Sequence, residues 1–358
     1  MRHSILATGV VVLATAAQAA LGADASAERT VVNEQGGASP RRAEDTFAPP
    51  KGLQDNPIVV PADNPITAGK IALGQQLFFD KRLSKTKAMS CETCHVPEKG
   101  WTDGLQLSPK FDGSMNVRHS PTLYGAGYYP DLYWDGRAKG LEAQILAAWK
   151  GQMGADPDAI ARDVEAIPAY NAAFEKELGG PPTGDRIVKA LGTFVRTIHA
   201  GDTPYDRNPG RYQAGFKVLS EVASCTLCHL PPVYSDTLFH NVGVGASAEK
   251  PDAGRGKIVA DAAAKASREV TAEEQKLQGA FKTPTLRGLA LTAPYFHDGG
   301  VATLESAVDY MLGGGTANAN LDEKLKPKTL TAQQKKDLLA LLRALTPESK
   351  PYPRPQLP

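Results

Sequence analysis

The 358-residue chain has little net charge, few long apolar runs and few strand-like patterns. Its 40 basic and 39 acidic residues leave a formal net charge of +1, which excludes the strong basic footprint of a protein that binds nucleic acid or a membrane surface. The apolar run from Ile5 to Ala17 is too short to span a bilayer as a retained anchor, so we do not expect an integral membrane protein. Few stretches alternate at period two, so the sequence favours helices over sheets.

The first 52 residues are typical of a targeting segment followed by a tether. Arg2 and His3 precede the apolar run, and Ala17-Gln-Ala19 is a small-residue cleavage pattern. We therefore predict a signal peptide over residues 1–19, with cleavage as late as residue 23 as the alternative. Residues 20–52 are polar and carry no apolar period, which predicts a disordered linker. For a Gram-negative source, the mature protein is expected to be periplasmic.

Cysteine is scarce, and all four cysteines belong to two copies of Cys-x-x-Cys-His. The copies comprise Cys91, Cys94 and His95, and Cys225, Cys228 and His229. Two thiols about one helical turn apart can each bond to a porphyrin vinyl group, and the histidine then binds the iron on its proximal side. A redox dithiol does not need the histidine, and a zinc site would need two distant motifs to converge. The pattern therefore predicts two covalently bound haem c groups.

The length and the motif spacing indicate two domains of ordinary size. We place an N-terminal haem domain at residues 53–204, a C-terminal haem domain at residues 205–346 and a Pro-rich tail at residues 347–358. Long connections rich in glycine and proline separate the periodic segments. The predicted fold class is all-α, with two cytochrome c-like haem domains whose long loops wrap around the cofactors.

Several segments carry helix signals. Thr67–Phe79 places its apolar residues on one broad side, although Gly69 and Gly74 weaken the helix propensity. Thr183–His199 has a cleaner apolar face, and its terminal histidine is expected to be solvated or to cap the helix. Thr331-Ala-Gln-Gln334 is a capping box that predicts the start of a further helix.

Six short sequence segments and the two motifs occur together in the order that is found in a known family. They are Leu73–Ser84, Ser120–Leu123, Tyr133–Arg137, Leu141–Gln144, Phe281–Arg287 and Ala293–Gly300. Together with the motifs they closely resemble the bacterial di-haem cytochrome c peroxidase family, which includes the MauG-type enzymes. The likeness extends from about Leu73 to about Leu345.

The resemblance implies unequal roles for the two haem groups. The haem at His95 would react with peroxide, and the haem at His229 would be a higher-potential electron-transfer centre. Fourteen residues beyond His297, the family's distal ligand to the second haem falls on Met311, within an amphipathic segment predicted to be a helix. Histidine/methionine ligation raises the reduction potential of a haem. MauG-type members carry tyrosine at this position, so Met311 favours the peroxidase branch.

The same resemblance assigns three further residues to the chemistry. Trp134 matches the family's tryptophan between the two haem groups, where it would relay electrons. Gln152 stands where the family uses a glutamate as the acid-base group, and Gln144 matches a second residue of the distal pocket. Glutamine can hydrogen-bond peroxide but cannot transfer a proton at a useful pKa. A chain of water molecules, or another acid such as Glu142, is the alternative source of protons.

Two other positions depart from the family pattern. Phe111 occupies the place of the removable histidine that many members use as a sixth ligand, which predicts an open iron, with His119 as an alternative ligand. His119 itself replaces an asparagine that binds calcium in the family, together with carbonyl groups matching Thr292 and Pro294. The resemblance keeps calcium binding as an open prediction. His119 argues against it, because imidazole is a poor ligand for calcium.

The predicted function is reduction of hydrogen peroxide to water by a periplasmic di-haem c-type cytochrome peroxidase. Its electrons would come from a small cytochrome c or cupredoxin. One alternative is a MauG-like high-valent di-haem oxidase that acts on a partner protein, and another is a di-haem electron carrier without peroxide turnover. Family members are often dimers, so the resemblance also leaves a homodimer open, although no residue indicates one.

Overall fold

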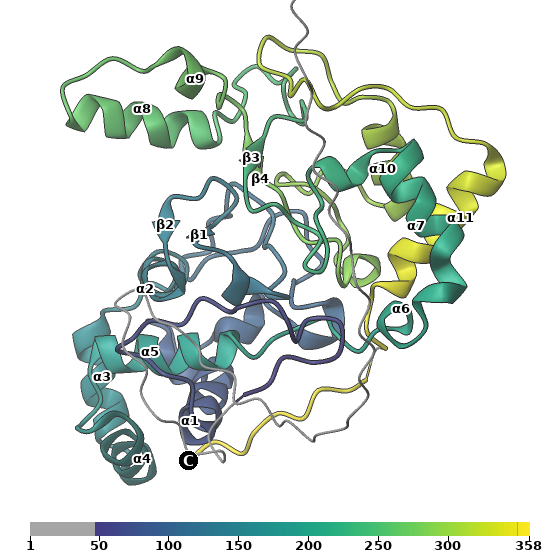
Figure 1. Cartoon of the computed structure of the whole chain (residues 1–358). Helices are drawn as coiled ribbons and strands as arrows, with labels where there is room; N and C mark the ends of the chain where they lie inside the picture. Colours follow the sequence, from purple (N-terminus) through teal and green to yellow (C-terminus); the bar gives the residue numbers. More distant parts are fainter. Residues whose placement is uncertain (1–46, 349) are drawn as a thin grey trace, which may run out of the picture. The chain divides into compact units, whose positions relative to one another are not determined.

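The structure is a computed structural model that describes residues 47–348 and 350–358 (Figure 1). The predicted signal peptide, and the predicted linker up to residue 46, lie outside the described residues. Within the part that is described, no helix is both long enough and apolar enough to cross a bilayer.

Helices joined by long loops make up most of the regular structure (Figure 1). They are α1 (Ala68–Phe79), α2 (Leu141–Gly151), α3 (Pro157–Glu165), α4 (Pro168–Leu178), α5 (Gly184–Val195), α6 (Pro204–Arg207), α7 (Gln213–Lys217), α8 (Arg255–Lys265), α9 (Ala272–Gln275), α10 (Leu304–Leu312) and α11 (Ala332–Ala344). The prediction of a mainly helical fold is confirmed.

Two short antiparallel ladders were missing from the all-α prediction. Strand β1 (Asp131–Leu132) pairs with β2 (Ala138–Lys139), and β3 (Phe239–His240) pairs with β4 (Phe281–Lys282). Each strand has only two residues, so no period-two alternation exists for the sequence to display. The ladders still matter for the site, because the Tyr133–Arg137 string is the turn between β1 and β2.

Helix α1 packs chiefly against α5, and both begin at the predicted threonines. The side chain of Thr67 accepts a hydrogen bond from the Lys70 amide, and Thr183 caps α5 in the same way. A β-carbon on Gly74 would lie 2.0 Å from the carbonyl oxygen of Ala190. Glycine therefore permits the close approach of the two helices, which outweighs its low helix propensity. Helix α5 ends at Val195, four residues before its predicted end.

Two hydrophobic clusters form the main cores. The first draws its buried members from residues 73–200, and the second draws them from residues 218–345. Helix α11 packs against α7 in the second cluster, and its predicted capping box between Thr331 and Gln334 is confirmed. Each cluster falls within one predicted haem domain, and the boundary at residue 204 stays a prediction.

The packed part of the chain begins before residue 53. The ring of Phe47 stacks on His199 with 5.2 Å between centroids, and the Asp202 amide donates to the carbonyl oxygen of Lys51. The expectation that His199 is solvated or caps a helix is therefore wrong. Both of its ring nitrogens are buried, because the chain preceding the first domain covers the end of α5.

The C-terminal segment lies over the first Cys-x-x-Cys-His motif. Figure 1 shows it in yellow, running from α11 to its end beside α1. Arg354 forms ion pairs with Glu98 and with Glu92, which stands between the two cysteines. Tyr352 stacks on Phe79 of α1. The predicted tail is thus attached to the N-terminal half by both charge and aromatic contacts.

Candidate functional site

One large cavity, of about 800 Å³, is lined by both Cys-x-x-Cys-His motifs. Helix α2 contributes lining residues from the first hydrophobic cluster, and α10 contributes them from the second. The segment between β1 and β2, strand β4 and the loop that follows β4 also contribute to the wall. The cavity therefore brings together residues that are more than two hundred positions apart.

Each motif begins with a short helical turn that orients its histidine. The turns cover Cys91–Thr93 and Cys225–Leu227. The Nδ1 atom of His95 lies 2.9 Å from the carbonyl oxygen of Trp101, and that of His229 lies 3.1 Å from the carbonyl oxygen of Tyr234. Since a carbonyl can only accept, Nδ1 must be the protonated nitrogen in each ring. The Nε2 lone pair is left to bind iron, as in other histidine-ligated metal sites.

The sulfur atoms fit covalent haem attachment better than the two alternatives. Burial raises the pKa of Cys91 to about 12, and that of Cys94 and Cys225 to about 11. Such thiols stay neutral and make poor redox nucleophiles. In the described residues the two motifs do not converge into one cluster of metal ligands. Paired thiols, a free imidazole nitrogen and an adjoining cavity together fit a haem c group at each motif.

Helix α2 presents one stripe of residues to the cavity. Leu141, Gln144, Ile145, Ala148 and Gln152 recur at helical spacing, and all line the cavity wall. The stripe is apolar apart from two amides, and it contains no carboxylate or histidine.

The amide of Gln152 is held by a neighbouring loop. Its Nε2 donates to Oδ1 of Asn116 at 3.4 Å, and its Oε1 is buried without a hydrogen-bond partner among the described residues. Asn116 also lines the cavity, and nothing in the sequence had singled it out. A buried oxygen without a partner is costly unless a ligand or water satisfies it, so Gln152 is suited to accept a hydrogen bond from a bound molecule.

Glu142 does not line the cavity, although it lies on the same helix. Both of its carboxylate oxygens accept from the guanidinium of Arg196, at 2.5 and 2.7 Å. Arg196 is fully buried, and Asn64 also donates to the same carboxylate. Glu142 is therefore a structural anion between α2 and α5 and not the replacement acid that the sequence left open.

Phe111 and His119 differ in their relation to the cavity. The ring of Phe111 packs against the first hydrophobic cluster outside the cavity, and its amide donates to the carbonyl oxygen of Gln152. His119 lines the cavity but is 4% exposed, and its Nδ1 donates to the carbonyl oxygen of Leu105 at 2.8 Å. The sixth-ligand role of His119 stays a prediction.

Trp134 is fixed by hydrogen bonds to both halves of the chain. Its Nε1 donates to the carbonyl oxygen of His119 at 2.9 Å, and its own carbonyl oxygen accepts from the Lys282 amide at 2.8 Å. Gly136, two residues later, has a φ of +67°, and a β-carbon there would clash with the ring of Phe239. The turn that carries Trp134 is therefore pressed between the two halves and faces the cavity.

Met311 is on the cavity side of α10. The predicted helix is confirmed, with Thr303 as its N-cap. Leu304, Ala307, Val308, Met311 and Leu312 form a stripe at helical spacing that lines the cavity. The structure brings Met311 to the same cavity as His229, and its role as an iron ligand stays a prediction.

The predicted calcium ligands are also at the cavity wall. Thr292 and Pro294 line it together with His119. The hydroxyl group of Thr292 donates to the carbonyl oxygen of Leu289. Calcium binding stays an open prediction, with imidazole an unfavourable ligand for this hard cation.

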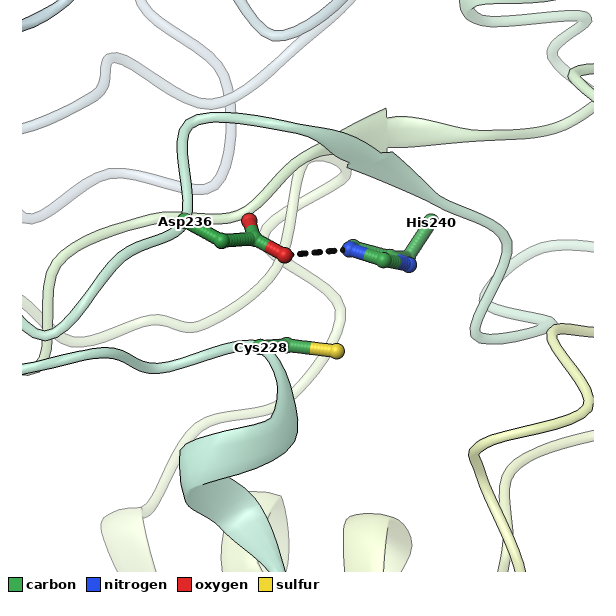
Figure 2. A group of neighbouring side chains, drawn as sticks. All are labelled: Cys228, Asp236 and His240. Atoms are coloured by element: carbon green, nitrogen blue, oxygen red, sulfur yellow. Dashed lines mark hydrogen bonds and ion pairs between the residues drawn. The ribbon is translucent and has the colours of Figure 1, made fainter.

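A charged cluster that the sequence did not predict adjoins the second motif (Figure 2). His240 lies between two carboxylates, with Nε2 2.8 Å from Asp236 and Nδ1 2.5 Å from Asp322, and near the sulfur of Cys228. Burial favours the neutral ring, but hydrogen bonds to Asp236, Cys228 and Asp322 raise the pKa of His240 to about 10. The imidazolium has no lone pair for a metal, so the cluster is an ion-pair network beside the haem site.

Comparisons with known proteins agree with this geometry. A family model described as di-haem cytochrome c peroxidase matches residues 68–213. The methylamine utilization protein MauG of Methylorubrum extorquens is 35% identical over 310 residues, covering 83% of this chain and 84% of that protein. The cytochrome-c peroxidase IdrP1 of Denitromonas iodatirespirans is 36% identical over 336 residues, covering 85% of this chain and 88% of that protein.

A solved structure extends the likeness to the fold. It is a MauG-like protein associated with microbial copper homeostasis, with a TM-score of 0.71 and 30% identity, covering 82% of this chain and 93% of that one. Family membership implies two haem c groups, and the two motifs are the predicted attachment sites. The chain belongs to the di-haem cytochrome c peroxidase family, whose members are haem oxidoreductases.

Proposed function

We propose that the protein is a periplasmic peroxidase that reduces hydrogen peroxide to water with electrons from a small cytochrome c or cupredoxin. The observation that carries the proposal is the unequal lining of the cavity. Met311 reaches it from the second hydrophobic cluster, whereas α2 in the first cluster offers two amides and an apolar stripe. One end of the cavity is thus suited to electron transfer and the other to binding a small polar molecule.

The proposed function gives each of these residues a separate role. His95 would hold one haem, and His229 with Met311 would hold the other. When bound, the two haem groups supply the redox chemistry that reduces peroxide. Trp134, fixed between the halves by two hydrogen bonds, is the proposed electron relay. The apolar residues of α2 exclude bulk water, and Gln152 orients peroxide by hydrogen bonding.

The location and partners are proposed from the sequence. The expected export signal places the protein in the periplasm, where covalent haem attachment and a soluble electron donor are both available. Homodimer formation stays a prediction.

Steady-state kinetics test the proposal directly. The protein carrying both haem groups is expected to oxidise a reduced small cytochrome c or cupredoxin when peroxide is added, with two electrons consumed per peroxide. The measurement is donor absorbance against time. Turnover no faster than that of free haem at equal iron concentration would contradict the peroxidase function and leave the electron-carrier alternative.

Replacement of Met311 tests whether this residue is an axial ligand of the haem at His229. A Met311→His change is expected to lower the reduction potential of the haem at His229 by roughly 0.1 V or more, within the ~0.8 V range that axial ligands span. Potentiometric titration measures the change, and Met115→His, at a methionine that is 49% exposed, is the matched control. An unchanged potential in Met311→His would remove Met311 as the ligand.

Oxidation of a partner protein is the second candidate function. It is favoured by the 35% identity to MauG and by the fold of the MauG-like protein associated with copper homeostasis. This function predicts that peroxide causes a defined mass change in a co-purified periplasmic protein when no small donor is present. Fast turnover with a small donor, and no modified protein, would favour the peroxidase.

A further inference from the structure

A peroxidase at this site lacks a proton donor on α2, and this inference rests on the proposed function. Reduction of one hydrogen peroxide to two waters consumes two electrons and two protons. The departing oxygen must be protonated as the O–O bond breaks, because hydroxide is a poor leaving group. Gln144 and Gln152 are amides and cannot supply that proton.

The carboxylates at the cavity wall are already engaged. Within the described residues they are Asp135, Asp261 and Asp322. Asp135 accepts from Arg118 at 2.6 Å and from Arg137 at 3.0 Å. Asp322 pairs with His240, and Asp261 pairs with Lys257 on α8. Each of these carboxylates therefore acts as an acceptor in an ion pair and not as a proton donor.

His119 is also excluded as the donor. Its Nδ1 proton is committed to the carbonyl oxygen of Leu105, at 2.8 Å. Burial lowers the pKa of His119, so the ring is neutral and its Nε2 carries no proton. The imidazole could accept a proton but has none to deliver into the cavity.

Tyr133 brings a phenol to the same part of the wall. It lines the cavity and packs against the first hydrophobic cluster. Its hydroxyl group makes only a long hydrogen bond, 3.4 Å, to the carbonyl oxygen of Gln144, and unlike the ring N–H of His119 the O–H can rotate toward another acceptor. The residue has a φ of +65°, a left-handed conformation that is unfavourable for an aromatic side chain. Backbone strain of this kind is maintained where the fold fixes a side chain in a required direction. The ladder between β1 and β2 holds Tyr133 toward α2 and the adjacent Trp134 toward His119.

The charges around the phenol suit reversible loss of its proton. The guanidinium of Arg137 lies 3.4 Å from the centroid of the Tyr133 ring, and Asp135 lies on the far side of that guanidinium. Burial raises the pKa of Tyr133, while Arg137 acts in the opposite direction. The phenol therefore stays protonated at neutral pH, and the guanidinium stabilises the phenolate formed during a proton transfer.

We propose that Tyr133 donates the proton that converts the departing oxygen of hydrogen peroxide to water. The O–O bond breaks and the departing oxygen keeps the bonding electron pair. That oxygen already carries one hydrogen, and the phenol O–H bond breaks to give it the second. The other oxygen keeps its own hydrogen and becomes the second water by taking two electrons from the donor protein and one proton from solvent. The phenolate takes a proton back from solvent beside the exposed Arg137.

A Tyr133→Phe variant tests the proposal in the protein carrying both haem groups. Peroxide turnover is expected to fall about 10²-fold, at the lower end of the range for general acid catalysis. The solvent deuterium isotope effect of the wild type and the high-pH decline of its rate should both disappear. The control is Tyr128→Phe, which removes a buried phenol outside the cavity whose pKa burial also raises to about 12. A Tyr133→Phe variant with wild-type rate and isotope effect would overturn the proposal.

A second variant separates proton donation from a structural role. Gln152→Glu places a second proton donor at the cavity, so Tyr133→Phe should lower the rate much less in the Gln152→Glu background than in the wild type. If Tyr133 only supported the pocket, Tyr133→Phe would lower the rate by the same factor in both backgrounds, and the proposal would fail. An inactive wild type would instead refute the proposed function itself, so the two failures are distinguishable.

Discussion

Replacing Gln152 with glutamate is expected to raise peroxide turnover about 10²-fold. Gln152 lines the cavity, and its Oε1 is buried without a partner, so a carboxyl group of almost the same shape would occupy the same position. General acid-base catalysis is typically worth about 10²–10⁴-fold, and the phenol of Tyr133 accounts for the lower part of that range. The apolar stripe of α2 would raise the pKa of the new carboxyl group and keep part of it protonated.

The same change two helical turns earlier is the matched control. Gln144→Glu puts an identical charge on the same stripe, but next to the carbonyl oxygen that accepts from Tyr133. Steady-state rates with a saturating donor protein measure both variants. An equal gain in the two variants would mean that charge in the cavity, and not a proton donor at residue 152, limits the wild type. No gain in either would mean that another step limits turnover.

Replacing Arg287 with methionine is expected to cost about 3–5 kcal/mol of folding free energy, because it leaves a buried carboxylate unpaired. Arg287 and Asp206 are 4% and 3% exposed, and two hydrogen bonds of 2.8 and 2.9 Å join them. The guanidinium also donates to the carbonyl oxygens of Gly52, Ala200 and Pro232. It therefore holds together three segments that are distant in sequence.

Denaturant unfolding of the protein carrying both haem groups measures the loss. Arg207→Met is the control, because its ion pairs with Asp202 and Glu348 are exposed and should contribute nothing measurable. Removing both buried charges with Arg287→Met and Asp206→Leu should recover most of the stability, since no charge then stays unpaired. If Arg287→Met were no less stable than Arg207→Met, the buried pair would not be a main support of the fold.

Local signals in the sequence predicted the cofactor sites and determined the helix starts. The spacing of Cys-x-x-Cys-His is set by covalent bonding to the haem, so the predicted sites can be read from the sequence without knowledge of the fold. Thr67, Thr183 and Thr331 each cap the helix that was predicted to follow, because capping depends only on residues three positions apart. The resemblance then identified the family without any knowledge of contacts.

Only the tertiary structure decided which polar side chains face the cavity. Glu142 and Gln144 are two residues apart on α2. Glu142 is ion-paired with Arg196 at the end of α5, whereas Gln144 lines the cavity wall. Tyr133 lies in the turn between two strands that are too short to show an alternating pattern, and its direction depends on a left-handed backbone within that turn, which is packed by both halves. Charge pairing, burial and backbone direction depend on residues far apart in the chain. The sequence by itself predicted where the haem groups attach, and long-range packing decided which side chains line the cavity beside those motifs.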